Sequence, residues 1–358
     1  MPTAPLFYQP LVLARVKATP IGNTDVYAAH RAGLELTQKA YSNEQFKPRM
    51  DGIVAGFTKL QDELAGSTTL QVPQFAYDDN GYVANRVMTT MRLHPELFDT
   101  ASPDQAAEIG VKLVAEAKKE LATNPGMRAV GDTLEVAPDM TFLLQRHWEG
   151  KTIHDEDVAY LGVTAARELQ RAVTPLPPDA TSPLQWLEEG TVWTMALWPG
   201  AAAKTAAALG LAVNVPVVEK VVAGMRADMK RTEPTAEGPV ASVTMLLGAA
   251  GITGTDDAAR TGAYAVLQGT PLEGVPAGIA QAIVQAKKIP AERTEYVAKR
   301  IVGTGGDEGN VIGLIAELEQ MMKPVPPPGP VPPPPPAPVP PPGPPAPVPP
   351  PGPVPPPT

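Results

Sequence analysis

Apolar side chains recur every three or four positions over much of the chain, and this spacing predicts a mainly α-helical protein. Within residues 53–64, one helical face carries Ile53, Phe57, Leu60 and Leu64. Similar stretches follow as far as residue 322, so we expect the body to consist of multi-helix modules with few strands.

The clearest helix start lies at Ser102. Ser102 and Gln105 form a Ser-x-x-Gln capping box, and Pro103 occupies the first helical position, where its missing amide costs nothing. The apolar face that follows consists of Ile109, Leu113, Ala117 and Leu121.

A further helix is predicted to begin at the acidic run 155–157 and to end near Arg167 and Arg171. Acidic residues near the start and basic residues near the end complement the helix dipole. Its apolar face is expected to be Val158, Leu161, Ala165 and Leu169.

Strand signals are few and early. Residues 11–17 (LVLARVK) and 69–76 (TLQVPQFA) each have the composition of a short strand. Two such segments are too few for a large sheet.

A proline-rich polar segment, residues 174–182 (TPLPPDATS), is the best candidate domain boundary. Ser182 with Gln185 forms a second capping box after it. We therefore expect an N-terminal, mostly helical domain over 1–175, an all-helical domain over 182–323 and a separate tail over 324–358.

The C-terminal domain contains a weak internal repeat of about 35 residues. The dipeptide Glu-Gly begins at Glu237, Glu273 and Glu308, and an apolar stretch follows each copy. Two copies and a final half-copy fit a short array of helix–turn–helix units. The alternative is chance similarity between Gly- and Ala-rich helices, and no named repeat signature matches.

Composition limits the function classes. The net charge is −9 and the pI is about 5.1, which argues against nucleic-acid binding because such proteins usually present a basic face. Cysteine is absent, so disulfides, thiol nucleophiles and cysteine-based metal sites are excluded. The N-terminus lacks the pattern of a secretory signal peptide. We expect a cytoplasmic protein.

The stretch 191–218 contains only one charged residue before Glu219, namely Lys204. It is interrupted by Pro199, Gly200 and Pro216, and much of it is alanine. A buried helix pair is the preferred interpretation, and a membrane hairpin is the alternative.

The sequence contains no complete catalytic or cofactor-binding motif. The Gly150-Lys151-Thr152 sequence lacks the upstream glycine of a phosphate loop. The glycine-rich segment 303–310 (GTGGDEGN) is expected to connect two helices, with Asp307 as N-cap. The four histidines form no helical metal pair, although His147 and His154 flank a turn and lie next to the acidic run 155–157. We predict no catalytic residues, no metal and no cofactor.

Two tryptophans are candidate partner-binding residues. Trp186 and Trp193 are seven positions apart, so one helical face carries both. Aromatic residues at this spacing usually belong to a core, but they also form the centres of protein interfaces.

The last 35 residues, 324–358, contain 24 prolines and no charged or aromatic residue. Proline lacks an amide donor and fixes φ, so we expect a disordered tail that favours the polyproline II helix. SH3, WW and EVH1 domains require basic or aromatic residues that the tail lacks. A groove that stacks bare prolines would accept the run Val331, Pro332, Pro333, Pro334, Pro335 and Pro336.

The tail, the repeat and the lack of catalytic motifs favour a non-catalytic scaffold or adaptor whose tail is a partner ligand or a spacer. Protein partners, such as a polyproline-binding domain, and self-association are expected. An enzyme with a dispersed helical site is one alternative, and a membrane-associated protein that uses 191–218 is another.

Overall fold

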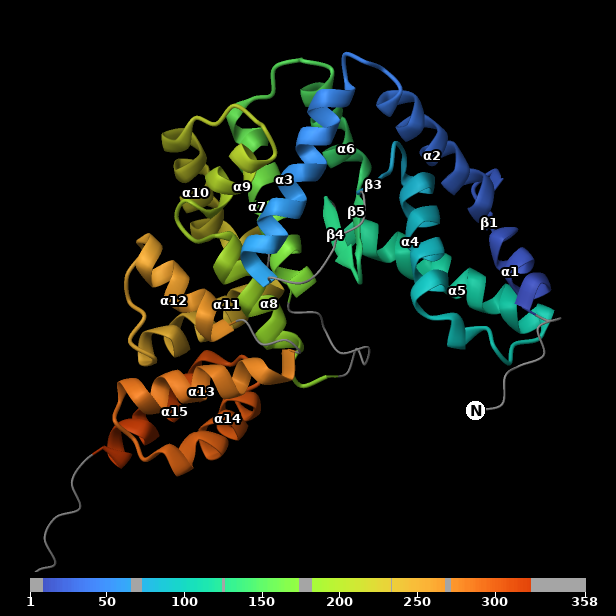
Figure 1. Ribbon diagram of the computed structural model, residues 1–358. Helices are drawn as coiled ribbons and strands as arrows, with labels where there is room; N and C mark the ends of the chain where they lie inside the picture. Colours follow the sequence, from blue (N-terminus) through green and yellow to red (C-terminus); the bar gives the residue numbers. More distant parts are fainter. Residues whose placement is uncertain are drawn as a thin grey trace, which may run out of the picture. The chain divides into compact units, whose positions relative to one another are not determined.

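The computed structural model describes residues 9–65, 73–123, 126–173, 182–232, 234–267 and 272–322, and these are mainly helical (Figure 1). They form fifteen α-helices, three short 3-10 helices and five short strands. The predicted fold class is therefore confirmed as mostly α-helical.

The chain up to residue 173 contains all five strands of the described residues. Its elements are α1 (Gln9–Lys17), β1 (Pro20–Ile21), β2 (Thr24–Asp25), α2 (Val26–Tyr41), α3 (Lys47–Ala65), β3 (Gln74–Phe75), α4 (Asp79–Leu93), η1 (Pro95–Leu97), α5 (Pro103–Thr123), β4 (Met127–Val130), β5 (Thr133–Val136), α6 (Pro138–Trp148) and α7 (Asp155–Val173).

From residue 182 onward the described elements are all helical. They are α8 (Gln185–Ala196), α9 (Ala201–Ala208), α10 (Val215–Thr232), α11 (Pro234–Ala249), α12 (Asp257–Leu267), η2 (Leu272–Gly274), α13 (Val275–Ala286), η3 (Ala291–Arg293), α14 (Thr294–Gly303) and α15 (Glu308–Met321).

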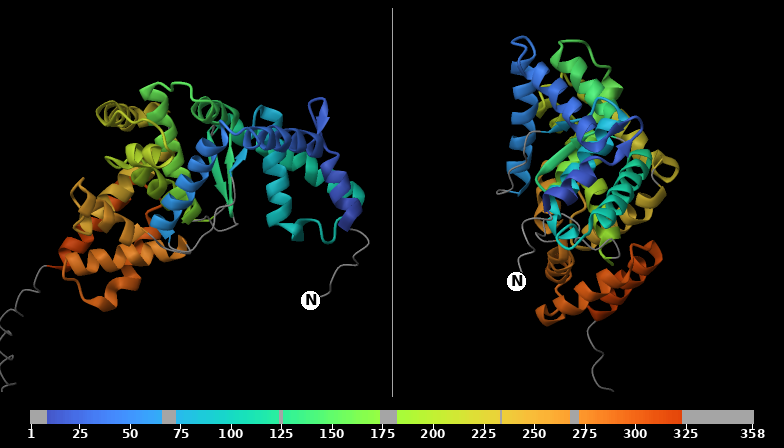
Figure 2. Two further views of the ribbon diagram at one scale, coloured as in Figure 1. Left: turned by 45° about the horizontal axis from the view of Figure 1, so that its top comes forward. Right: turned by 90° about the vertical axis from the view of Figure 1, so that its right-hand side faces the viewer.

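The larger sheet has the strand order β3-β5-β4, with β3 parallel and β4 antiparallel to β5. It lies between α4, which packs on β5, and α7, which packs on β4 (Figures 1 and 2). Arg128 of β4 and Glu135 of β5 are cross-strand partners in this sheet. The sheet thus brings ionisable residues into the centre of a helical body.

Several helix starts follow directly from the sequence. The Ser102 amide donates to Gln105 Oε1 at 2.7 Å, and the Gln105 amide donates to Ser102 Oγ at 3.3 Å. Both halves of the predicted capping box are therefore formed. Helix α7 begins at the acidic run as predicted, and its expected apolar face is buried.

One strand prediction is wrong. Residues 11–17 lie in helix α1, where Val12 and Val16 are fully buried while Leu11 is exposed. Two buried valines four residues apart mark one face of a helix rather than a strand. The other predicted strand, 69–76, corresponds in part to β3, and its residues before 73 lie outside the described residues.

The second capping box is not formed. Helix α8 begins at Gln185, and its N-cap is Leu184 without a side-chain bond. Ser182 Oγ instead accepts a hydrogen bond from the Leu184 amide at 3.2 Å, within the turn that precedes the helix. The N-cap therefore lies two residues later than predicted.

The largest apolar cluster draws on residues from both sides of the predicted domain boundary. Phe57 and Leu161 lie in it together with Val192 and Ala202. A second cluster joins α8 to the helices from α11 to α15. Most of the boundary itself lies outside the described residues, and the division into two domains stays a prediction.

The stretch 191–218 forms the end of α8, all of α9 and the start of α10. Most residues of α9 and of this part of α8 are buried, as expected for a helix pair in a core. No helix among the described residues is both long and apolar enough to span a membrane.

The apolar stretches of the predicted repeat lie in α11, α13 and α15, with α12 and α14 between them. The Glu273 dipeptide directly precedes α13 and the Glu308 dipeptide begins α15, but the Glu237 dipeptide lies inside α11. The repeat stays a prediction.

Helices α7 and α9 approach each other closely at Gly162. A Cβ atom at this position would lie 2.4 Å from the Ala202 carbonyl oxygen. Gly224 of α10 is also in a helix interior, but a Cβ there would meet no atom within 4 Å. The two glycines therefore form a matched pair for testing the packing.

We predict that Gly162→Ala lowers the free energy of unfolding by about 1–3 kcal/mol, because the helices must separate. Gly224→Ala should raise it by about 0.5–1 kcal/mol, because alanine favours the helix. Urea unfolding followed by circular dichroism measures both. Equal effects of the two substitutions would contradict the close packing of α7 on α9.

Candidate functional site

The structure places the two predicted tryptophans in different surroundings. Trp193 belongs to the largest apolar cluster and is 6% exposed, with the Arg167 guanidinium 4.8 Å from its ring centre. Trp186 is half-buried beside the second cluster and packs on Gly306. Core packing accounts for Trp193, whereas Trp186 retains some exposed surface. Their binding role stays a prediction.

The predicted tail site, consisting of Val331 and the prolines 332–336, lies outside the described residues. The glycine-rich segment 303–310 connects α14 to α15 as expected, and Asp307 Oδ1 caps α15 by accepting from the Asn310 amide at 2.9 Å. It therefore serves as a helix connector.

The histidines are separated in the structure. His30 Nδ1 lies 2.8 Å from Asn85 Oδ1, and His94 Nδ1 lies 3.0 Å from Glu96 Oε1. Burial lowers the pKa of His147, and Arg49 adds to this effect. The described part of the chain contains no group of three or more His, Cys, Asp or Glu residues that could hold a metal ion.

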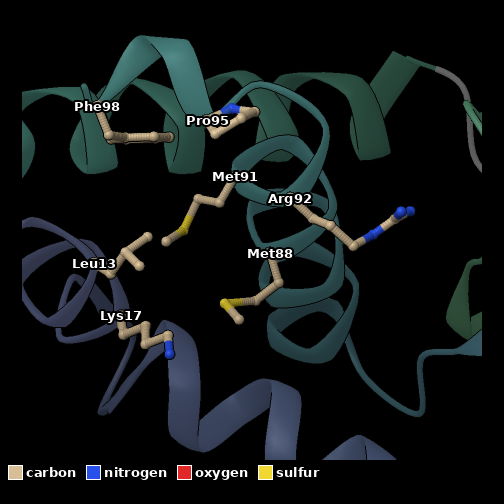
Figure 3. A pocket seen from close by; sticks show the side chains of 7 residues that line it. All are labelled: Leu13, Lys17, Met88, Met91, Arg92, Pro95 and Phe98. Atoms are coloured by element: carbon tan, nitrogen blue, oxygen red, sulfur yellow. The ribbon is translucent and has the colours of Figure 1, made fainter. Parts of the chain in front are cut away.

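One candidate pocket is lined by α1, α4 and η1 with its following residue (Figure 3). It has a volume of about 270 Å³, and its lining residues are Leu13, Lys17, Met88, Met91, Arg92, Pro95 and Phe98. The thioethers of Met88 and Met91 extend into the space between Leu13 and Lys17 (Figure 3).

The two cations of this pocket are engaged elsewhere. The Lys17 ammonium lies 5.3 Å from the ring centre of Tyr27. The Arg92 guanidinium points away from the pocket and bonds Thr133 Oγ1 at 2.7 Å, and it also pairs with Asp132. The pocket is thus an apolar depression with flexible methionine walls, and it lacks a group that could do chemistry.

Ionisable side chains converge instead around β4. On one face of the sheet, five residues from four elements form what we call the sheet-face network: Tyr82 and Arg86 of α4, Glu120 of α5, Arg128 of β4 and Glu135 of β5. Arg86 Nε lies 2.8 Å from Glu120 and 3.9 Å from Glu135, and Arg128 also pairs with Glu120.

At the free edge of β4, five residues form the sheet-edge network: Arg167, Glu168 and Arg171 of α7, and Glu188 and Glu189 of α8. Glu168 Oε2 accepts a hydrogen bond from the Ala129 amide at 3.0 Å, and its Oε1 pairs with Arg167 and Arg171. Arg171 bonds both Glu188 and Glu189 at 3.1 Å. The Glu168 carboxylate therefore accepts the hydrogen bond of an amide at the strand edge and pairs with two arginines.

A cavity of about 380 Å³ separates the two networks, and we call it the arginine cavity. Its polar lining consists of Arg86, Arg128, Arg171, Glu188 and His94. The apolar part comes from Leu93, the β4 backbone around Ala129 and Val130, and Ala172. Three guanidinium groups from three elements thus line one space.

The three buried glutamates differ in protonation. Burial raises the pKa of Glu135 and of Glu188 to about 7, although nearby arginines oppose the shift. Burial also acts on Glu168, but the attraction of Arg171 and Arg167 and the Ala129 amide outweigh it, so its pKa is lowered. Glu168 is therefore ionised at neutral pH, whereas Glu135 and Glu188 change charge near it.

Sequence reasoning missed this site. The sequence pattern predicts only that Arg167 and Arg171 lie near a helix end, where they complement the dipole, yet they are 5% and 6% exposed. The residues of the sheet-face network come from four separate elements and have no local spacing that predicts a site. The usable signal was the three ionisable residues at 167, 168 and 171, within a helix whose other nearby positions are apolar apart from Gln170.

The chain matches no protein-family model, no curated protein and no solved structure. Its function must therefore be argued from its own residues.

The two buried glutamates of the sheet-edge network should respond in opposite directions to removal of their charge. Because the folded-state pKa of Glu188 is above its ordinary value, the wild type loses stability as the pH rises from about 4.5 to 7. We predict that Glu188→Gln raises the free energy of unfolding by roughly 1–3 kcal/mol at pH 8 and leaves it unchanged near pH 4.5.

Glu168→Gln is the matched comparison. The folded-state pKa of Glu168 is lowered, so its ionised form stabilises the protein above its ordinary pKa, and this stability is lost as the pH falls. We expect a loss of about 3–5 kcal/mol at pH 8, because two buried arginines lose their shared anion. Chemical unfolding at both pH values tests the pair, and the assignment fails if both variants are destabilised equally at pH 8.

Proposed function

We propose that this protein is a non-catalytic scaffold or adaptor whose proline-rich tail acts as a partner ligand or as a spacer. The single observation that carries the proposal is the tail sequence, with 24 prolines in 35 residues and no charge. Such a segment lacks the amide donors and apolar periodicity needed for a fold of its own.

The end of the described body supports a fixed attachment for the tail. Helix α15 is the last described element, and its Val311, Leu314 and Leu318 are fully buried. On its exposed side, Glu317 pairs with Arg300 of α14 at 2.9 Å and with the Tyr296 hydroxyl. The tail therefore follows a helix that apolar packing and polar bonds hold in place.

The composition of the tail restricts the kinds of domain that could bind it. Only Lys323, at its start, offers the basic residue that SH3 domains favour, and the aromatic residues used by WW and EVH1 domains are missing. A groove that stacks bare prolines on aromatic rings is the partner that this chemistry fits best. Used as a spacer, the tail would extend roughly 110 Å at about 3.1 Å per residue.

The arginine cavity favours a second candidate function. Perturbed pKa values beside converging polar groups in one cavity are typical of ligand-binding and catalytic sites. A helical protein with a dispersed small-molecule site is therefore the alternative, and it is compatible with a tail that recruits partners.

We predict that deletion of residues 324–358 removes a set of proteins that the full chain captures from an extract of its source cells. Replacement of Pro332, Pro333, Pro334, Pro335 and Pro336 by alanine should remove the same proteins, because a proline-stacking groove needs the polyproline surface. Quantitative mass spectrometry of the captured proteins provides the measurement.

A third variant, with a Gly/Ser linker of equal length in place of the tail, distinguishes ligand from spacer. A ligand role requires loss of the partners with this linker, and a spacer role requires that they remain while the deletion variant loses them. Identical captured proteins from the full chain and the deletion variant would show that the tail has neither role.

A further inference from the structure

We propose that the arginine cavity binds the carboxylate of a small organic acid. The proposal is independent of the tail and concerns the space between the sheet-face and sheet-edge networks. Its volume of about 380 Å³ is within the range of small-molecule sites, which is about 300–1,000 Å³.

The shape of the lining suits an amphipathic anion. Arg86, Arg128 and Arg171 come from α4, β4 and α7, and the forked geometry of guanidinium matches a carboxylate. Leu93, Val130 and Ala172 supply apolar wall. A ligand with a charged end and an apolar body would contact both the guanidinium groups and the apolar wall.

Two of the guanidinium groups retain donors that the protein does not use. Arg86 bonds Glu120 through Nε, and its Nη1 is buried without a hydrogen-bond partner in the described structure. Arg128 pairs with Glu120 through Nη1, and its Nε is likewise without a partner there. Both nitrogens have almost no accessible surface, so an anion in the cavity would reach them only after the two side chains turn toward it.

The charge balance of the surrounding residues favours a monoanion. Four arginines (86, 128, 167 and 171) stand against five glutamates (120, 135, 168, 188 and 189) across the two networks. When Glu135 and Glu188 are protonated, the arginines outnumber the ionised glutamates by one. A single carboxylate then restores neutrality, whereas a phosphate dianion would exceed it.

Protonation of the two glutamates couples binding to pH. Glu188 faces Arg171, Glu168 and Glu189, and Glu135 faces Arg86, Arg128, Glu120 and Tyr82. His94 also lines the cavity. A proton on Glu188 removes the negative charge in the lining, so the carboxylate should bind more tightly at pH 6 than at pH 8.

The test uses the full chain with benzoate as the probe and benzamide as its uncharged analogue. Calorimetric titration at pH 6 should show benzoate binding and no comparable benzamide binding. Arg128→Gln should weaken benzoate binding about tenfold or more, because a charge-assisted hydrogen bond is lost. Arg31→Gln, which changes an exposed arginine paired with Glu35, should leave it unchanged.

Two further readouts do not depend on the Arg128 variant being stable. Amide resonances of Ala129, Val130 and Gly131 in the wild type should shift as benzoate is added. Benzoate should bind about threefold or more tightly at pH 6 than at pH 8, and Glu188→Gln should reduce this difference.

Equal binding of benzoate and benzamide would overturn the proposal, as would benzoate shifts confined to other parts of the chain. Tighter binding of inorganic phosphate than of benzoate would overturn the assignment to a monocarboxylate.

Discussion

The buried carboxylate of Glu168 connects the free edge of β4 to two arginines of α7. It accepts the Ala129 amide at the free edge of β4 and pairs with Arg167 and Arg171 of its own helix. An unpaired amide at a buried strand edge would cost free energy. Because Arg171 in turn bonds Glu188 and Glu189, the same ion links the sheet edge to α8. The short three-stranded sheet is thereby fixed inside a helical protein.

Once Glu168 occupies this position, the chemistry of its neighbours follows. Arg171 already pairs with Glu168, so its attraction offsets the burial of Glu188 only in part. The pKa of Glu188 therefore rises to about 7. Glu135 is fully buried beside Arg86, and burial raises its pKa to about 7 as well. Identical side chains thus become an anion at neutral pH or a titrating acid according to how many cations and amides each one meets. This difference, rather than any motif, is what makes the arginine cavity a candidate site.

The helix starts that depend on residues close together in the sequence were the features that could be predicted. Ser102 with Gln105, the acidic start of α7 and Asp307 all act within one helical turn, so their neighbours in the sequence are also their neighbours in space. The wrong strand at 11–17 arose because valine favours strands while the spacing of Val12 and Val16 is helical, and the packing of one apolar face decided the outcome. The candidate site could not be predicted from the sequence, because its residues come together only in the tertiary structure. These residues include Arg86, Glu120, Arg128 and Arg171.

The two binding roles proposed for the body and for the tail would use different physics. The tail sequence has no charge, so the proposed partner would recognise it by shape and apolar stacking. The arginine cavity is lined by charged groups, and the proposed carboxylate would be bound by guanidinium forks and favoured by the proton on Glu188. A change of pH would therefore act on the second interaction and have little effect on the first. Because α15 is held to the body by buried leucines and the Glu317 pairs, a partner bound to the tail would be attached to the body that contains the cavity. A scaffold that also senses a small acid is therefore consistent with a single chain, and the two roles can be separated by changing the tail or Arg128 alone.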